Sequence, residues 1–313
     1  MKVLFTYDYG QEKMKAIEAL GYDIVYVHES EIENNEAVND VEILACYNPF
    51  STLRVDQMHN LKWIQLSSIG FDQLPVETVI KNNIEVTNNR GGYSKPMGEW
   101  IVMNLLEIFK HRKRFYADQM EKRWALNSSI LEVVGKKIAF LGTGTIAQEA
   151  AKRLQGFEAE IIGFNTSGHE TRYFNNCYAL SELNEKLHEL DAVIVTLPHT
   201  ESTHHIINKE VMDLMKDDSI LINVSRGGNL DEEALIDALK RDKFLGVAVD
   251  VFESEPLAKD SPLWDFERVY FSPHNSWISE MKNERRYSMI YENLKRYKEG
   301  KSLNNIVNIE RGY

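Results

Sequence analysis

The stretch Lys137-Ile138-Ala139-Phe140-Leu141-Gly142-Thr143-Gly144-Thr145-Ile146-Ala147 decides the fold of this 313-residue chain. Its apolar run at residues 138–141 predicts a buried strand, and the glycines that follow predict a tight turn. A helical pattern over residues 146–154 and a second apolar run over residues 160–164 complete a strand-helix-strand unit. This arrangement predicts a parallel sheet with a helix packed against it.

The glycine-rich turn has the spacing of a dinucleotide-binding loop. Gly142 permits the tight turn, Gly144 lets the backbone approach a diphosphate, and the small Ala147 allows close packing of helix and strand. The first N–H groups of the helix, at Thr145 and Ile146, have no partner within it and can bind the anion. A glycine turn can also be purely structural, but its position between an apolar strand and a helix favours a cofactor site.

Similar patterns extend on both sides of this unit. Residues 3–7, 24–27, 43–47, 63–66 and 84–87 predict strands of a smaller N-terminal α/β region, with a helix over residues 11–20. Residues 192–196, 219–223, 246–251 and 269–271 predict further strands of the glycine-loop region, with a helix over residues 231–241. Long helical patterns over residues 97–119 and 279–298 suit crossings between two domains.

Composition excludes several classes of function. The chain has 48 acidic and 36 basic residues, a net charge of -12, which argues against a nucleic-acid partner. The basic run at residues 110–114 lies on a helical pattern and is interpreted as a solvated helix face. We find neither a secretory signal nor a membrane-length apolar stretch, and Cys46 and Cys177 have no disulfide or zinc spacing. We therefore expect a cytoplasmic protein with no membrane partner.

Cofactor choice depends on the residue that ends the second strand, about 20 positions after the loop, where an acidic side chain binds the ribose of NAD. Here that residue is Asn165, 21 positions after Gly144 (165 − 144 = 21). Thr166 and Ser167 follow it, and Arg172 lies close behind. The absence of a carboxylate removes repulsion against a 2′-phosphate, which favours NADP slightly over NAD. The alternative is a polar turn that tolerates both cofactors.

Three later segments each place ionisable groups at the end of a predicted strand. They are residues 223–228 with Arg226, residues 250–256 with Glu255, and residues 272–275 with His274. In a doubly wound sheet the carboxyl ends of the strands face the ligand crevice, so these side chains are expected to converge there.

With these motifs in order, nearly the whole chain resembles the D-isomer-specific 2-hydroxyacid dehydrogenase family, either its glyoxylate/hydroxypyruvate reductase-like members or a phosphoglycerate dehydrogenase-like member without a regulatory domain. The resemblance implies that Arg226 binds the substrate carboxylate and carbonyl, that His274 is the acid/base, and that Glu255 orients it. The chemistry is consistent. An imidazole can protonate an alkoxide near neutral pH, and a guanidinium binds a planar carboxylate with two hydrogen bonds.

The resemblance extends to further segments. Residues 67–72 resemble the loop whose amides, at Ile69 and Gly70, receive the substrate carboxylate. Residues 89–100 resemble the hinge into the long helix. Leu197 and Pro198 resemble the loop over the cofactor, and Asp250 would lie by the nicotinamide amide. The family commonly has two small residues after the histidine, whereas this chain has Asn275-Ser276-Trp277, so substrate size stays open.

These inferences predict an α/β chain of two doubly wound parallel-sheet domains. Residues 1–97 plus 281–313 are expected to form a flavodoxin-like substrate domain, and residues 98–280 a Rossmann cofactor domain. The expected activity is hydride transfer between NAD(P)H and a small 2-oxo acid, giving a D-2-hydroxy acid, in a homodimer. The alternative is a nucleotide-sensing binding protein of the same fold without turnover. The spacing of His199, His204 and His205 is not a usual ligand set, so no metal is expected.

Overall fold

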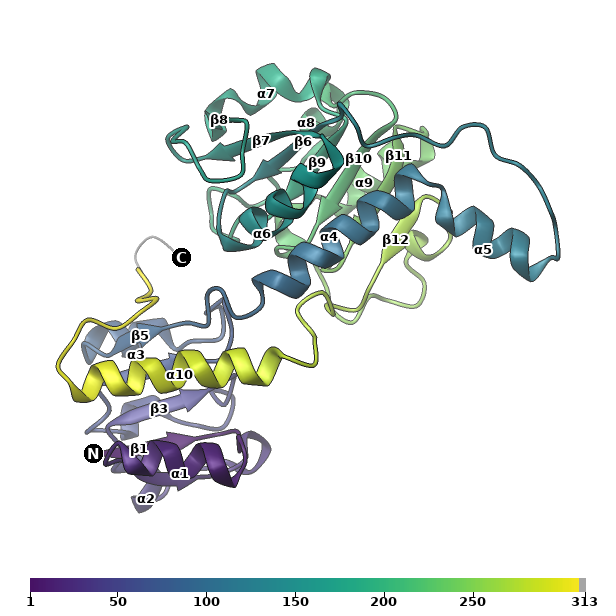
Figure 1. Cartoon of the computed structure of the whole chain (residues 1–313). Helices are drawn as coiled ribbons and strands as arrows, with labels where there is room; N and C mark the ends of the chain where they lie inside the picture. Colours follow the sequence, from purple (N-terminus) through teal and green to yellow (C-terminus); the bar gives the residue numbers. More distant parts are fainter. Residues whose placement is uncertain (310–313) are drawn as a thin grey trace. The chain divides into compact units, whose positions relative to one another are not determined.

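The computed structural model describes residues 1–309. The chain divides into two compact units, one made of Met1–Tyr93 with the C-terminal segment from Ser279, the other of Ser94–Ile278. Each unit is built on one sheet whose strands are all parallel, with helices between most successive strands (Figure 1). This confirms the predicted fold class, two doubly wound α/β domains.

The first unit has a five-stranded sheet in the order β2-β1-β3-β4-β5, which is the flavodoxin-like order. Its strands are β1 (Lys2–Phe5), β2 (Asp23–Tyr26), β3 (Ile43–Cys46), β4 (Trp63–Leu66) and β5 (Glu85–Thr87). Its helices are α1 (Gln11–Ala19), α2 (Glu36–Asn39), α3 (Val76–Lys81) and α10 (Lys282–Lys298), with short 3-10 helices η1 (Glu29–Glu31) and η2 (Val55–Gln57).

The last helix of the chain packs on the first strands of the sheet. Ile290 and Leu294 of α10 are buried in one cluster with Val3, Phe5 and Trp63. Figure 1 shows α10, in yellow, lying along the same sheet as β1 and β3. The apolar runs in these strands are buried on both faces, as expected for a parallel sheet covered by helices.

The second unit has a seven-stranded sheet in the order β12-β11-β10-β9-β6-β7-β8. The order reverses next to β6, as in Rossmann folds. Its strands are β6 (Lys137–Leu141), β7 (Glu160–Asn165), β8 (Asn176–Ala179), β9 (Ala192–Val195), β10 (Ser219–Asn223), β11 (Phe244–Val249) and β12 (Val269–Phe271). Its helices are α4 (Ser94–Phe109), α5 (Arg112–Met120), α6 (Thr145–Leu154), α7 (Leu183–Lys186), α8 (Lys209–Leu214) and α9 (Glu232–Lys240). Its 3-10 helices are η3 (Gln155–Phe157), η4 (Leu180–Glu182), η5 (Leu187–Glu189), η6 (Gly227–Asn229) and η7 (Pro262–Trp264).

One prediction about the elements of this unit is wrong, and one strand was not predicted. Residues 97–119 were expected to form one helix, but the helix ends at Phe109 and a second one starts at Arg112. His111 between them has a left-handed backbone (φ +49°), which interrupts the helical hydrogen bonds. The edge strand β8 was not predicted, because its Asn-Cys-Tyr-Ala sequence has no apolar alternation. Within residues 1–309 no helix has the length and apolar character needed to span a bilayer.

Candidate active site

The glycine-rich loop connects β6 to α6 and leaves open space at the helix start. Gly142 has φ +92°, and a Cβ there would lie 3.1 Å from the Thr196 carbonyl oxygen. Gly144 is the N-cap of α6, no side chain caps the helix, and a Cβ at Gly144 would meet no atom within 4 Å. The first N–H groups of α6, from Thr145 onward, thus border an open cradle that fits the diphosphate of a dinucleotide.

Asn165, at the end of β7, faces the protein. It is 6% exposed, and its Nδ2 donates to the Thr143 hydroxyl (3.3 Å) and the His169 carbonyl (2.9 Å). Its Oδ1 accepts from the N–H groups of Ser167 (3.3 Å) and His169 (3.1 Å). Asn165 therefore shapes the turn through internal hydrogen bonds, and the neighbouring Thr166 and Ser167 are exposed.

In the segment after β9, the backbone carbonyls of residues 197 and 198 accept hydrogen bonds from side chains. Asn229 Nδ2 donates to the Leu197 carbonyl (3.1 Å), and the Thr203 hydroxyl donates to the Pro198 carbonyl (2.7 Å).

The three histidines that follow this segment interact with each other and with a glutamate. The rings of His199 and His204 share a hydrogen bond (3.2 Å), and His205 Nε2 lies 2.7 Å from Glu253 Oε1. Within residues 1–309 no group of three or more His, Cys, Asp or Glu side chains has a geometry that could hold a metal ion.

His274 and Glu255 form a direct pair at the carboxyl edge of this sheet. His274 Nδ1 lies 2.9 Å from Glu255 Oε2, and the two side chains are 42% and 37% exposed. The other carboxylate oxygen of Glu255 accepts from the Phe252 N–H at 3.0 Å, which fixes the carboxylate plane. The His274 carbonyl accepts from the Trp277 indole at 2.9 Å. Both sides of the pair are thus held by neighbouring groups.

Asp250 holds the turn that presents His274. Its carboxylate is fully buried and accepts from the Ser272 hydroxyl (2.5 Å), the Asn275 N–H (2.7 Å) and the Ser276 N–H (3.1 Å). The sequence resemblance suggested only a contact with the nicotinamide amide. An acidic residue directly after the apolar strand β11 was the available signal for this turn, since a buried carboxylate requires several donors.

Arg226 follows β10 and is half-buried. Asn223 Nδ2 donates to the Arg226 carbonyl (3.0 Å), and Arg226 Nη1 donates to the Ser225 carbonyl (2.8 Å). The next residue, Gly227, lies against the loop after β11, because a Cβ there would lie only 1.9 Å from the Phe252 carbonyl carbon. The segments that carry Arg226 and Glu255 are therefore in backbone contact.

Together these three side chains can bind an anion and move a proton. Arg226 offers a guanidinium suited to a carboxylate, and the His274 ring has its Nδ1 occupied by Glu255. A His held in this way presents Nε2 for proton transfer. Strands β10, β11 and β12 are neighbours, so their carboxyl ends bring the three residues to one edge of the sheet.

In the first unit, the loop after β4 presents backbone N–H groups. Within residues 1–309 the N–H groups of Ser68, Ile69 and Gly70 donate to no protein acceptor. Their carbonyl oxygens are all occupied. Ser68 accepts from the Asn89 N–H (2.8 Å), Ile69 from Asn88 Nδ2 (2.8 Å), and Gly70 from the Ser68 hydroxyl (2.7 Å). Such a loop can receive an anion.

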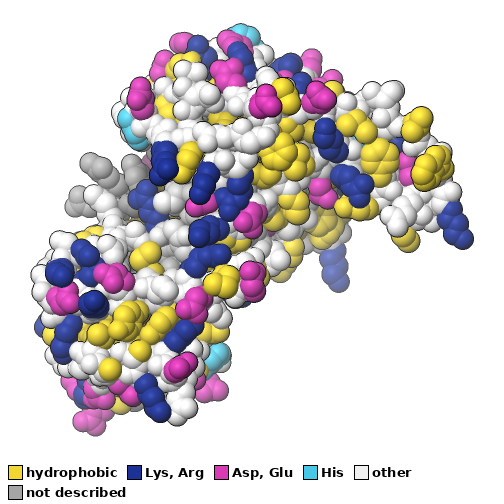
Figure 2. Space-filling view, in the orientation of Figure 1, with side chains coloured by type: hydrophobic (Ala, Val, Ile, Leu, Met, Phe, Trp, Pro, Cys, Tyr) yellow, Lys and Arg dark blue, Asp and Glu magenta, His cyan; other side chains and the backbone are white. Residues whose placement is uncertain are grey.

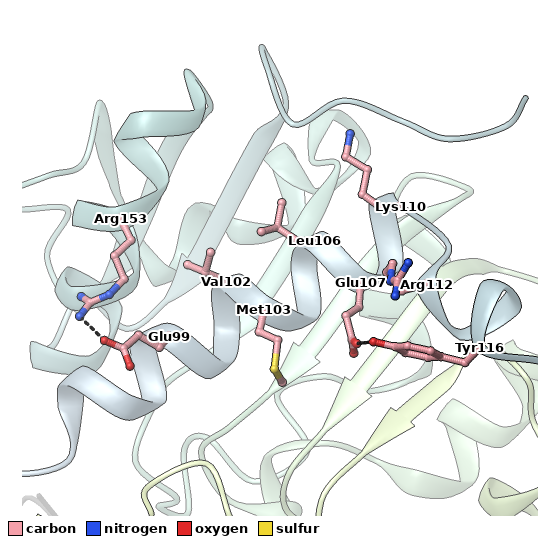
Figure 3. Close-up of a pocket in the computed structure, with 9 residues that line it drawn as sticks. All are labelled: Glu99, Val102, Met103, Leu106, Glu107, Lys110, Arg112, Tyr116 and Arg153. Carbon is pink, nitrogen blue, oxygen red and sulfur yellow. Dashed lines mark hydrogen bonds and ion pairs between the residues drawn. The ribbon is translucent and has the colours of Figure 1, made fainter. Parts of the chain in front are cut away.

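A separate hollow on the second unit contains none of these residues. Figure 3 shows it along α4, with the exposed Met103 and the half-buried Val102 and Leu106 between two polar contacts. Glu99 pairs with Arg153 at one end (2.9 Å), and the Tyr116 hydroxyl contacts Glu107 at the other (3.5 Å). Its apolar lining and position make it a surface feature distinct from the catalytic edge.

Comparison with known proteins shows which family the sequence and fold resemble. The sequence profile described as D-isomer specific 2-hydroxyacid dehydrogenase, NAD binding domain, matches residues 102–276. A glyoxylate reductase of Thermofilum pendens is 34% identical over 70% of this chain and 67% of its own length. A D-3-phosphoglycerate dehydrogenase of Methanocaldococcus jannaschii is 28% identical over 99% of this chain, which spans 60% of that relative. A solved D-isomer specific 2-hydroxyacid dehydrogenase from Xanthobacter autotrophicus Py2, in complex with NADPH and MES, is 26% identical with a TM-score of 0.83, covering 100% of this chain and 99% of that one.

Proposed function

Because this chain belongs to the D-isomer specific 2-hydroxyacid dehydrogenases, a family of NAD(P)-dependent oxidoreductases, we propose that it reduces a small 2-oxo acid to a D-2-hydroxy acid with Arg226, Glu255 and His274 at the reacting atoms. The observation that supports this assignment best is the hydrogen bond between His274 Nδ1 and Glu255 Oε2, at the edge of the sheet where Arg226 also lies. The nicotinamide supplies the hydride. The remaining chemistry, proton transfer and charge stabilisation, falls to the protein.

His274 donates the proton that the reduced carbonyl oxygen needs. With Nδ1–H donating to Glu255, the proton at Nε2 is available to the substrate oxygen, and the carboxylate stabilises the imidazolium before transfer. Arg226 binds the carboxylate and the carbonyl oxygen, and its positive charge stabilises the developing alkoxide. In the first unit, the N–H groups of Ile69 and Gly70 are suited to receive a substrate carboxylate.

The cofactor and the substrate are assigned to different units. Residues 98–280 bind the dinucleotide through Gly142, Thr143, Gly144, Thr145 and Ile146, with Leu197 and Pro198 over it and Asp250 near the nicotinamide. Residues 1–97 plus 281–313 bind the substrate. The open cradle at Gly144 supports the first assignment, and the unpaired N–H groups after β4 support the second.

NADP is the cofactor we propose, slightly ahead of NAD. The turn after β7 carries no carboxylate before Glu170, and the exposed Thr166, Ser167 and Arg172 border it. Hydroxyl and guanidinium groups there suit a 2′-phosphate. The Xanthobacter relative, solved with NADPH, is consistent with this choice.

We also propose a homodimer formed through α4, α5 and the segment before β6. This region exposes large apolar side chains, including Met103 (47%), Met120 (84%), Trp124 (99%) and Leu126 (93%). Figure 2 shows hydrophobic side chains gathered over α4 and α5. Apolar surface of this extent is typical of an interface, and a second copy would cover the hollow of Figure 3 as well. Light scattering during gel filtration measures the mass directly. The cytoplasmic location remains a prediction.

A substrate screen tests the proposed function. NADPH or NADH absorbance is followed with glyoxylate, hydroxypyruvate and branched 2-oxo acids, in wild type and in Arg226→Gln. We expect turnover of at least one acid in the wild type, and loss of it in the variant with cofactor affinity unchanged. Cofactor binding without turnover of any 2-oxo acid would instead favour the nucleotide-sensing alternative.

A further inference from the structure

A buried arginine without a carboxylate partner lies behind the loop that follows β4. Arg286, on α10, is 7% exposed, and no Asp or Glu within residues 1–309 forms an ion pair with it. Its Nε and Nη2 both donate to the Tyr93 hydroxyl, at 3.0 and 2.7 Å. Its guanidinium also lies 5.8 Å from the centre of the Tyr7 ring. Burying a cation among hydroxyl and aromatic groups, with no anion beside it, costs folding free energy and calls for a functional reason.

Tyr93 links Arg286 to the loop after β4 through a further hydrogen bond. Tyr93 is 4% exposed, and its hydroxyl donates to the Ser67 carbonyl at 2.5 Å. That carbonyl belongs to the peptide whose N–H is contributed by Ser68, the first of three N–H groups without an acceptor. A hydrogen bond to a carbonyl polarises its peptide and makes the N–H a stronger donor.

The loop is therefore organised as three consecutive peptides with occupied carbonyls and free N–H groups. Asn89 and Asn88 occupy the carbonyls of Ser68 and Ile69, and both of these donors are neutral amides. The Ser67 peptide is the exception, because its donor, Tyr93, itself receives two hydrogen bonds from a cation. Charge-assisted hydrogen bonds are roughly twice as strong as neutral ones.

We propose that Arg286, acting through Tyr93, is a positioning residue that orients and polarises the loop of Ser67–Gly70 for a carboxylate ligand. This inference rests on the proposed function, since the ligand is the carboxylate of the 2-oxo acid. Arg286 contributes a positive potential from within the first unit. It touches neither substrate nor cofactor.

The chain offers a matched control. Arg285 is the preceding residue on the same helix and has the same charge, but it donates to the Ser279 hydroxyl (3.2 Å) rather than to the tyrosine. Arg286→Gln and Arg285→Gln therefore lower the net charge equally, and only the first removes the link to the loop. Tyr93→Phe removes the link while keeping both arginines, and serves if Arg286→Gln fails to fold.

Steady-state kinetics and binding of oxamate, a 2-oxo acid analogue, to the full chain with saturating NADPH decide the matter. We expect Arg286→Gln and Tyr93→Phe to raise the KM and the oxamate Kd about tenfold, with kcat within about threefold and NADPH affinity unchanged. Arg285→Gln should stay within about twofold of wild type. Arg286→Lys, which keeps the charge, should recover part of the loss. Thermal melts identify any variant that is unfolded.

Equal oxamate affinities in Arg286→Gln, Tyr93→Phe and Arg285→Gln would overturn the inference, as would a wild type that binds no oxamate. A fall in kcat with unchanged KM would also contradict it, because the effect would then lie in the chemical step. The proposed function is judged separately. A wild type that binds oxamate but turns over no 2-oxo acid defeats the proposed function, while the comparison of oxamate affinities still decides the role of Arg286.

Discussion

Replacing Glu255 by Gln removes the charge beside His274 and keeps the shape of the side chain. The hydrogen-bonded atoms are 2.9 Å apart, and the two side chains are 42% and 37% exposed. Unit charges about 4 Å apart interact by about 1 kcal/mol in a water-like medium and about 4 kcal/mol at an effective dielectric constant near 20. Because both groups are well exposed, the lower value applies. Since about 1.36 kcal/mol equals a factor of ten in rate, the loss corresponds to roughly fivefold.

The sign follows from the mechanism. In reduction His274 donates a proton, and Glu255 orients its ring through Nδ1, so losing the carboxylate leaves fewer productive complexes. The kcat/KM for 2-oxo acid reduction should therefore fall roughly fivefold in Glu255→Gln. The assay is the initial rate at subsaturating substrate.

Glu253→Gln provides the control for this experiment. Glu253 lies two residues away and pairs with His205 instead, so its removal changes the net charge equally without touching His274. We expect the kcat/KM of Glu253→Gln to match that of wild type. A Glu255→Gln enzyme with a wild-type kcat/KM would refute the pairing, and an equal fall in both variants would attribute the effect to net charge alone.

Four other changes test the remaining assignments. Arg226→Lys should lower kcat/KM by about 10²-fold or more with NADPH affinity unchanged, because a point charge cannot copy two parallel hydrogen bonds; steady-state kinetics and cofactor fluorescence check both. His274→Ala should lower reductive turnover by about 10²- to 10⁴-fold, measured as initial rates at the optimal pH of the wild type. Asp250→Asn should lower the free energy of unfolding by about 1–3 kcal/mol in denaturant titrations, since a fully buried acceptor of several N–H and O–H donors is weakened. Asn165→Asp places a carboxylate oxygen against the His169 carbonyl now contacted at 2.9 Å, so it should cost about 1–3 kcal/mol of stability and shift cofactor preference from NADPH towards NADH; fluorescence titration of both cofactors would contradict this if the ratio of affinities stayed constant.

Apolar periodicity and turn residues were sufficient to predict most of the fold from the sequence. The strands over residues 63–66, 219–223 and 269–271 have the predicted bounds, because each is a short apolar run between turn residues. The break between α4 and α5 was missed because Lys110 and His111 are compatible with a helix, and only the left-handed backbone of His111 ends it. The strand β8 was missed because its place is set by pairing with β7.

The site divides in a similar way. Arg226, Glu255 and His274 could be placed at one sheet edge because strand ends in a doubly wound fold are topologically fixed. The orientation of Asn165 towards Thr143 could not be predicted, since an amide at a strand end suits solvent and turn equally. No sequence pattern indicated that Arg286 is buried or has a role in the site. An arginine in an amphipathic helix is normally solvated, and its burial beside Tyr93 depends on how α10 packs on the sheet.

The backbone contact at Gly227 limits which substitutions the catalytic edge tolerates, both in protein engineering and in evolution. Any side chain at Gly227 would overlap the backbone of Phe252, so substitutions there push apart the segments that carry Arg226 and Glu255. At Gly228, one residue further, the three atoms nearest to a Cβ would all belong to the ring of His199, a side chain that can rotate away. A library aimed at new substrates should therefore keep position 227 fixed and randomise position 228 together with position 199. Neighbouring glycines thus differ in mutational tolerance: one acts as a rigid joint between catalytic segments, and the other is free to vary.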